Sequence, residues 1–180
     1  MENRISPIKT IDIVQISLMA AITFIAASVI HIPTFMGVLH LGDSMIFLSA
    51  ILFGRKKAAI SSAVGMCLFD LLNGYTMWAP FTLIIKGTMG YIAGTIAYRK
   101  NYNGNKFSNN IFAFVVAGIW MIAMYYLGGA IILTFISKEF ALKQALIISL
   151  KDIPTNVFQV VGGIALALPL ITALKSKISR

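Results

Sequence analysis

One cation, Lys86, stands near the middle of the otherwise uncharged stretch APFTLIIKGTMGYIAG (79–94). Such a stretch predicts a membrane-spanning helix, in which a lysine costs at least about 2.5–3.5 kcal/mol unless it faces protein or water. Residues three or four apart share a helix face, and the face of Lys86 carries the small residues Ala79, Thr82, Gly90, Ala93 and Gly94. The opposite side carries Ile84, Ile85 and Ile92, which suit lipid.

The Lys86 ammonium group is therefore expected to face protein and to meet another group there. That group is either a ligand or an acid that only holds helices together. The Gly90-xxx-Gly94 spacing is typical of membrane helices that approach each other closely.

Polar and aromatic residues gather just before this helix. They are Asp70, Asn73, Tyr75 and Trp78, with Thr82 following in the helix itself. Pro80 suits an early helical position. These residue types predict a site that stacks a flat ring between aromatic side chains and fixes it with a few polar groups. The alternative is that Tyr75 and Trp78 belong to an interfacial aromatic belt.

A second polar face is expected in the last helix, at about 152–174. Asp152 and Pro154 occupy helix-start positions, and Asn156, Gln159 and Gly163 follow on one face. Amide side chains in hydrocarbon need hydrogen-bonding groups, which belong either to another helix or to a ligand. Pro169 is expected to kink the far end of this helix.

The segment 31–40 is not expected to form a regular helix, because Pro33 and Gly37 interrupt it. Asp43 or Ser44 looks like the N-cap of a following helix, 44–54, that is too short to cross a membrane. This favours a loop that forms the lid or wall of an outward-facing pocket, the alternative being a short tilted helix with a capping Asp43. His31 and His40 lack the spacing typical of metal ligands, so hydrogen-bonding roles are favoured for them.

Composition indicates an all-α integral membrane protein of one domain, 1–180. Apolar residues make up 58% of the chain, charged residues 12%, and the mean hydropathy is +0.86. Long uncharged stretches occupy 13–30, 44–54, 58–69, 71–85, 87–98, 107–137 and 153–174. The first helix, 11–30, is expected to be retained rather than cleaved as a signal peptide. Cys67 is the only cysteine, so no disulfide framework is expected.

The net charge of +9 is distributed as a topology signal rather than as a nucleic-acid surface. Most basic residues fall on alternate connections: Arg4 and Lys9, then Arg55, Lys56 and Lys57, then Arg99, Lys100 and Lys106, and finally Lys175, Lys177 and Arg180. The positive-inside rule then predicts six transmembrane helices with both termini cytoplasmic.

The connections of this bundle can also be predicted. Gly54–Lys57 reads as a tight turn before a helix at about 58–73, and 107–137 as a helix that bends at Gly128-Gly129. The segment 138–151 is either an interfacial helix or the outer end of the last span.

The sequence contains none of the patterns HExxH, GxSxG or P-loop. No catalytic residue, metal site or cofactor is therefore expected. A small intramembrane enzyme and a self-contained secondary transporter remain alternatives, although the latter usually shows two related halves. The sequence therefore favours a membrane protein with a pocket near its outer face and no visible energy source of its own.

The chain resembles the substrate-binding S component of an energy-coupling factor (ECF) transporter, in the riboflavin-transporter-like branch. The resemblance covers the whole length and rests on 41–54, on Asp70, on 78–87 with Gly90 and Gly94, and on 154–159. It implies a bacterial cell-membrane subunit that works with a membrane scaffold subunit and two cytoplasmic ATPases. In this family a small-xxx-small motif in the first helix meets the scaffold, and Ser17-xxx-Ala21 is its nearest match here.

The resemblance implies a vitamin ligand, and we expect a pyridine or pyrimidine compound ahead of riboflavin. Lys86, Asn156 and Gln159 would hydrogen-bond the ring, and Trp78 or Tyr75 would stack on it. The other residues assigned to the site are Asp70, Asn73, Thr82, Asp43 and His40. The loop 31–43 would close over the ligand.

Overall fold

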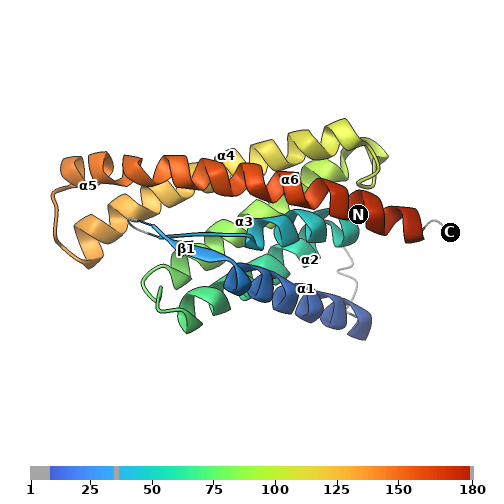
Figure 1. The fold of residues 1–180 in the computed structure, drawn as a ribbon, viewed down its shortest axis with the longest axis horizontal. Helices are drawn as coiled ribbons and strands as arrows, with labels where there is room; N and C mark the ends of the chain where they lie inside the picture. Colours follow the sequence, from blue (N-terminus) through green and yellow to red (C-terminus); the bar gives the residue numbers. More distant parts are fainter. Residues whose placement is uncertain (1–8, 35–36, 179–180) are drawn as a thin grey trace, which may run out of the picture.

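The structure, a computed structural model, describes residues 9–34 and 37–178. The basic residues Arg4 and Arg180 and the centre of the 31–43 segment lie outside the described residues. The main helices are α1 (Thr10–Val29), α2 (Gly42–Leu72), α3 (Ala79–Ala97), α4 (Phe107–Ile131), α5 (Leu142–Ser149) and α6 (Ile153–Ile178). Two short strands, β1 (His31–Pro33) and β2 (Val38–His40), form a hairpin (Figure 1). The described chain is otherwise all-α, as predicted.

Helix α2 consists of two antiparallel halves, 42–53 and 55–72. Gly54 breaks it with φ 75° and ψ −178°, a left-handed φ that glycine adopts at low cost. The hydroxyl oxygens of Ser49 and Ser61 lie 3.1 Å apart, whereas twelve residues of straight helix would separate them by about 18 Å. The chain therefore reverses at Gly54, which confirms the predicted tight turn.

The small-residue face of α3 packs against the second half of α2. A Cβ atom added at Gly90 would lie 2.8 Å from the Ala58 carbonyl oxygen, and one added at Gly94 would lie 2.5 Å from the Arg55 Cα. The predicted face is buried, including Lys86. The assignment of Ile85 to lipid is wrong. Helix α3 also contacts α4, and Ile85 is buried in the structure.

Two predicted helix boundaries are corrected. Helix α2 begins at Gly42 and has no side-chain cap within the described chain, so neither Asp43 nor Ser44 is its N-cap. The predicted bend at Gly128-Gly129 does not break α4, which continues to Ile131 and then changes to a π-helical turn, Ile132–Ile136. A Cβ added at Gly128 would make ordinary van der Waals contact with the Phe81 ring, at 3.4 Å.

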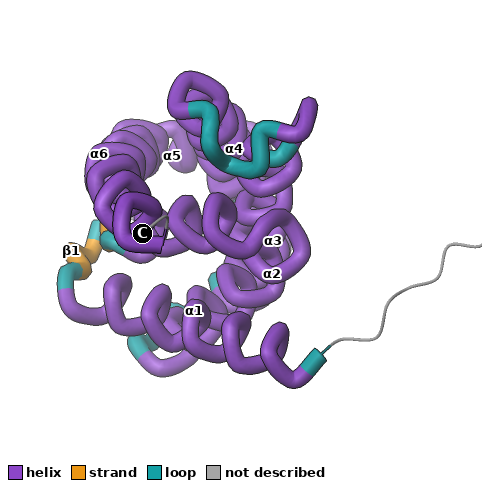
Figure 2. The backbone as a smooth tube through the Cα atoms, turned by 90° about the vertical axis from the view of Figure 1, so that its right-hand side faces the viewer, coloured by secondary structure: helices purple, strands orange, loops and turns teal. Residues whose placement is uncertain are grey.

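The predicted last helix, 152–174, corresponds to α6 (Ile153–Ile178). Helix α5 packs against α4 and is joined by a 3₁₀ turn, Leu150–Asp152, to α6, which includes Pro169. Viewed along the long axis, α1 and α4 lie at opposite edges of the bundle (Figure 2). Within the described residues, three segments are long and apolar enough to cross a membrane, namely 10–29, 107–136 and 142–177.

The basic connections meet at one end of the bundle. Lys57 pairs with Asp12 of α1 at 2.6 Å, and the Tyr98 hydroxyl donates to the Ile51 carbonyl at 2.9 Å. Lys175, near the end of α6, donates to the Gly104 carbonyl at 2.6 Å. The last turns of α6 and the first turns of α1 lie at this end, and α5 lies at the other (Figure 1).

Replacing Gly94 with alanine is expected to destabilise the protein by about 1–3 kcal/mol, because the new methyl group would overlap backbone atoms of Arg55 that cannot move aside. Gly162→Ala is the matched control. An added Cβ there meets nothing within 4 Å, so the change is expected to be neutral or stabilising by up to about 1 kcal/mol. Thermal unfolding in detergent measures both. Equal melting temperatures for the two variants would contradict the close packing of α3 on α2.

Candidate functional site

A buried ion pair joins α3 to the start of α2. The Lys86 ammonium nitrogen lies 2.5 Å from Asp43 Oδ1, and the two side chains are 0% and 1% exposed. Taking both charges out of water is costly, so further polar contacts are needed to satisfy them. Asp43 lies in the first turn of α2, where the helix dipole favours a negative charge. Lys86 also lies over the Tyr125 ring of α4, 5.3 Å from its centroid.

Helix α6 completes the environment of this pair. The Gln159 amide nitrogen donates to Asp43 Oδ2 at 3.0 Å. One turn further along α6, a Cβ added at Gly163 would lie 3.1 Å from the Asp43 Cβ. The face predicted from Asn156, Gln159 and Gly163 is thus turned toward the first half of α2. The ion pair is the point at which α2, α3, α4 and α6 converge.

The β1–β2 hairpin is tied to the same network. His31 pairs with His40 and Pro33 with Val38, so the segment predicted not to be a regular helix contains a short antiparallel ladder. The His40 backbone N–H donates to the Gln159 side-chain oxygen at 3.3 Å. Gln159 therefore connects the carboxylate of the ion pair to the hairpin.

His40 is a neutral, buried side chain. Its Nδ1 accepts the backbone N–H of Gly42 at 3.2 Å, which leaves the proton on Nε2. Burial, and secondarily the charge of Lys86, lowers the pKa of His40 to about 3. Among the described residues, no group of three His, Cys, Asp or Glu side chains could hold a metal ion.

A cavity that is partly open to solvent lies beside Gln159. Its lining comes from the hairpin, the α2–α3 connection, α3, α4 and the start of α6. The lining residues are Thr34, Gly37, Val38, His40, Asp70, Tyr75, Trp78, Thr82, Tyr125, Asp152, Thr155, Asn156 and Gln159.

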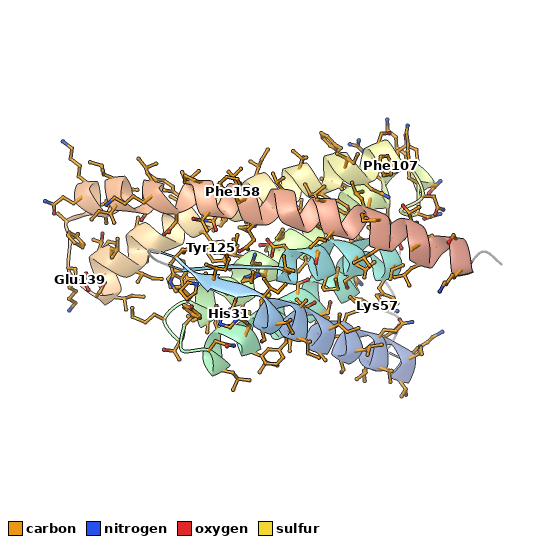
Figure 3. The ribbon with its side chains drawn as sticks, in the orientation of Figure 1. His31, Lys57, Phe107, Tyr125, Glu139 and Phe158 are labelled. Carbon is orange, nitrogen blue, oxygen red and sulfur yellow. The ribbon has the colours of Figure 1, made fainter. Side chains whose placement is uncertain are left out.

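Aromatic rings form much of the cavity wall. Trp78 and Tyr125 have ring centroids 5.5 Å apart, and the hydroxyls of Thr82 and Tyr125 lie 3.1 Å apart. Tyr75 is held parallel to the buried Phe69, at 6.1 Å and an interplanar angle of 13°. Figure 3 shows the labelled Tyr125 within the bundle, near the hairpin. Flat apolar surfaces with a few polar groups between them suit a small heterocyclic ring.

Most of the residues assigned from the sequence meet at this cavity. His40, Asp70, Tyr75, Trp78, Thr82, Asn156 and Gln159 line it. Among the described residues the lining does not include Lys86 or Asp43, which lie behind Gln159, or Asn73, whose amide donates to the Phe69 carbonyl at 2.9 Å. Ser17 and Ala21 lie on an exposed face of α1.

The cavity wall also contains six residues that were not predicted from the sequence: Thr34, Gly37, Val38, Tyr125, Asp152 and Thr155. Asp152 and Thr155 could have been included, because they flank Pro154 beside Asn156 at the same helix start. Tyr125 had no such signal, since it lies in the uncharged stretch 107–137 with nothing nearby to orient that helix.

A helical bundle of apolar segments around a polar and aromatic cavity defines a multi-pass membrane protein that can enclose a small molecule. Residues 7–176 match the family model of the ECF-type riboflavin transporter S component. The chain therefore belongs to the ECF-type riboflavin transporter S component family. It is a multi-pass cell-membrane protein of vitamin-type transport and not an enzyme.

Two relatives show where similar chains occur. A Pyrococcus woesei protein, named only as an uncharacterized protein in gap 3'region, is 36% identical over 106 residues, which are 57% of this chain and 71% of the relative. The thiamine precursor transporter HmpT of Lactococcus lactis subsp. cremoris (strain MG1363) is 32% identical over 87 residues. That match spans 47% of this chain and about half, 52%, of HmpT.

Removing one member of the ion pair is expected to cost about 3–5 kcal/mol, because the other charge stays buried without compensation. Lys86→Met and Asp43→Asn are the single variants, and the double variant leaves no net charge. We expect the double variant to be more stable than either single variant in thermal unfolding. Additive losses in this double-mutant cycle would show that the two side chains do not interact.

The contribution of His40 to the stability of the protein is expected to fall as the pH is lowered from 7 to 5. His40 has a pKa of about 3 in the folded chain against 6.5 ordinarily, so the unfolded chain takes up a proton that the folded chain excludes. This group's contribution is lost below about pH 6.5, at no more than about 1.4 kcal/mol per pH unit. His40→Asn keeps an acceptor for Gly42 and should flatten the dependence of melting temperature on pH. An unchanged slope in this variant would show that His40 is not the responsible group.

Proposed function

We propose that this protein is the substrate-binding S component of an ECF-type importer. It captures a water-soluble vitamin or vitamin precursor from outside, and a membrane scaffold subunit with two cytoplasmic ATPases drives its delivery inward. The observation that carries this proposal is the cavity, which combines aromatic walls with polar groups from the hairpin, α3 and α6. Family membership and the name of HmpT, a thiamine precursor transporter, support it.

The proposed topology has six transmembrane helices and cytoplasmic termini. The two antiparallel halves of α2 provide the second and third spans. The first half, 42–53, is too short to cross from surface to surface, so it begins below the outer surface and the preceding hairpin covers the remaining depth. The basic connections share one end, which the positive-inside rule assigns to the cytoplasm. The hairpin and the α2–α3 connection, both of which line the cavity, follow odd-numbered spans and are then on the outer side.

The cavity-lining residues are proposed to contact the ligand directly. Asn156, Gln159, Asp70, Thr82 and His40 supply hydrogen bonds. Tyr75, Trp78 and Tyr125 supply ring faces.

Two further groups are assigned indirect roles. The Lys86–Asp43 pair acts on the ligand through Gln159, whose side chain Asp43 orients. Asn73 acts through its hydrogen bond to the Phe69 carbonyl. The hairpin would close over the ligand.

The scaffold subunit is proposed to dock on α1. Ser17 and Ala21 are exposed there, and large apolar side chains accompany them, including Ile13 at 56% and Leu18 at 56% exposure. A small-xxx-small pair allows another helix to approach closely within the membrane.

The purified protein is expected to bind one vitamin without ATP. Native mass spectrometry against a panel containing riboflavin, pyridoxine and hydroxymethylpyrimidine identifies it. Asn156→Ala should weaken binding about tenfold, the loss of roughly one hydrogen bond. Val157→Ala, at a neighbouring exposed position that does not line the cavity, is the matched control.

Three results would contradict this function. They are a lack of binding to every member of the panel, uptake into liposomes driven by an ion gradient alone, and turnover of a substrate by the isolated chain. The second would indicate a secondary transporter and the third an enzyme.

A further inference from the structure

A second hollow, open to solvent, lies at the end of the bundle where the basic connections meet. Ile51 and Leu52 of α2, Asn103 and Asn105 of the α3–α4 connection, and Lys175 of α6 belong to its wall. None of these five residues lines the cavity beside Gln159. A group that enters this hollow is therefore bound separately from a ligand in that cavity.

The cation of this wall, Lys175, is held in a fixed position. Its ammonium group donates to the Gly104 carbonyl at 2.6 Å and to the side-chain oxygen of Asn105 at 2.8 Å. An ammonium group carries three N–H donors, so these two contacts leave one for a group in the hollow. Because Asn105 turns its oxygen toward Lys175, its amide nitrogen remains as a second donor.

The α3–α4 connection holds these donors in place. Asn103 and Gly104 have the left-handed φ values 49° and 69°, which restrict the conformations of this turn. A Cβ atom added at Gly104 would lie 3.1 Å from the Ile51 carbonyl oxygen, and the Asn110 amide donates to the Gly104 carbonyl at 2.8 Å. Packing and hydrogen bonds therefore position the donors, in contrast to lysines that extend freely into water.

The charge at this end of the bundle favours an anion. Exposed basic residues of the same connections are Arg99, Lys100, Lys106 and Lys177. Among the residues that the structure describes, no carboxylate lines the hollow, and Asp12 of α1 is already paired with Lys57. A phosphate group accepts several hydrogen bonds through charged oxygens, so it matches an ammonium group and an amide that are held side by side.

Apolar side chains beside the donors distinguish a lipid from a soluble anion. Leu52 forms part of the wall, Leu174 next to Lys175 is 37% exposed, and Phe107, two residues after Asn105, is 57% exposed. Figure 3 shows Phe107 at this end of the bundle. Exposed apolar side chains beside phosphate-binding groups are expected where the membrane meets water, and a phospholipid presents both kinds of surface there.

We propose that this hollow binds the headgroup of an anionic phospholipid, such as phosphatidylglycerol. The lipid phosphate accepts hydrogen bonds from Lys175 and Asn105, and its glycerol and acyl groups pack on Leu52 and Leu174. Under the proposed topology, the lipid belongs to the cytoplasmic leaflet. This site goes beyond vitamin capture, because it uses none of the residues that line the cavity beside Gln159.

The test is native mass spectrometry of the full chain in detergent, with equal amounts of phosphatidylglycerol and phosphatidylcholine that carry the same acyl chains. The wild type should retain one phosphatidylglycerol molecule in preference to phosphatidylcholine, which has no net charge. Lys175→Gln should lower this retention about tenfold, the loss of a hydrogen bond between charged groups. Lys177→Gln is the matched control. It removes the same charge from an exposed position outside the hollow, so its effect should be at most about twofold.

A second variant separates lipid binding from the structural contacts of Lys175. Leu52→Trp keeps the cation and its two hydrogen bonds but fills part of the hollow, so it should also lower phosphatidylglycerol retention. Melting temperatures in detergent show whether each variant is folded. If Lys175→Gln does not fold, Leu52→Trp and the lipid preference of the wild type decide.

Four outcomes overturn the lipid site. Equal retention of the two lipids by the wild type, or equal losses in Lys175→Gln and Lys177→Gln, would show only a general attraction to the basic end. Unchanged retention in Lys175→Gln and Leu52→Trp would show that Lys175 only holds the α3–α4 connection. Displacement of the lipid by inorganic phosphate would indicate a site for a soluble anion. Loss of ATPase co-purification in Lys175→Gln, with no lipid retained by the wild type, would assign the hollow to a protein partner.

This proposal and the proposed function fail separately. A wild type that retains phosphatidylglycerol but binds no vitamin would contradict vitamin capture and leave the lipid site intact. A wild type that binds a vitamin but shows no lipid preference would contradict only the lipid site.

Discussion

The ion pair between Lys86 and Asp43 is the interaction on which the rest of the structure depends. A lysine inside an apolar bundle must be neutralised, and Asp43 does this at 2.5 Å from the start of α2. The second oxygen of Asp43 then orients Gln159 of α6, which in turn accepts a hydrogen bond from the hairpin. The neutralisation of Lys86 by Asp43 therefore positions Gln159 and, through it, the hairpin, and both line the cavity. Asp70, which lines the same cavity, keeps one buried carboxylate oxygen without a hydrogen-bond partner in the described chain.

Much of the fold could be predicted because its signals are local. The face of α3 that carries Lys86 was visible in the spacing of its small residues, and the turn at Gly54 was marked by glycine followed by three basic residues. Ile85 was misassigned because a single helix does not reveal how many neighbours it has. The bend expected at Gly128 was wrong for a related reason, since glycine permits a bend but does not require one, and α4 continues through it to Ile131.

The sequence predicted the residues of the site better than it predicted the contacts between them. Asp70, Trp78 and Asn156 stood out as polar or aromatic groups at the ends of apolar segments, and all three line the cavity. The pairing of Asp43 with Lys86 joins residues 43 positions apart, and its local context equally suited a helix cap. Tyr125 could not be found at all, because only the packing of α4 on α3 turns it inward. The sequence of one chain does not specify which distant segments contact each other.

The most direct test of this account is an experimental structure of the protein with its vitamin bound. We predict that the ligand occupies the cavity between Trp78 and Asn156 and that Lys86 remains paired with Asp43 behind Gln159. A ligand in contact with the Lys86 ammonium group, with Asp43 displaced from it, would contradict the account, as would a ligand bound anywhere outside this cavity.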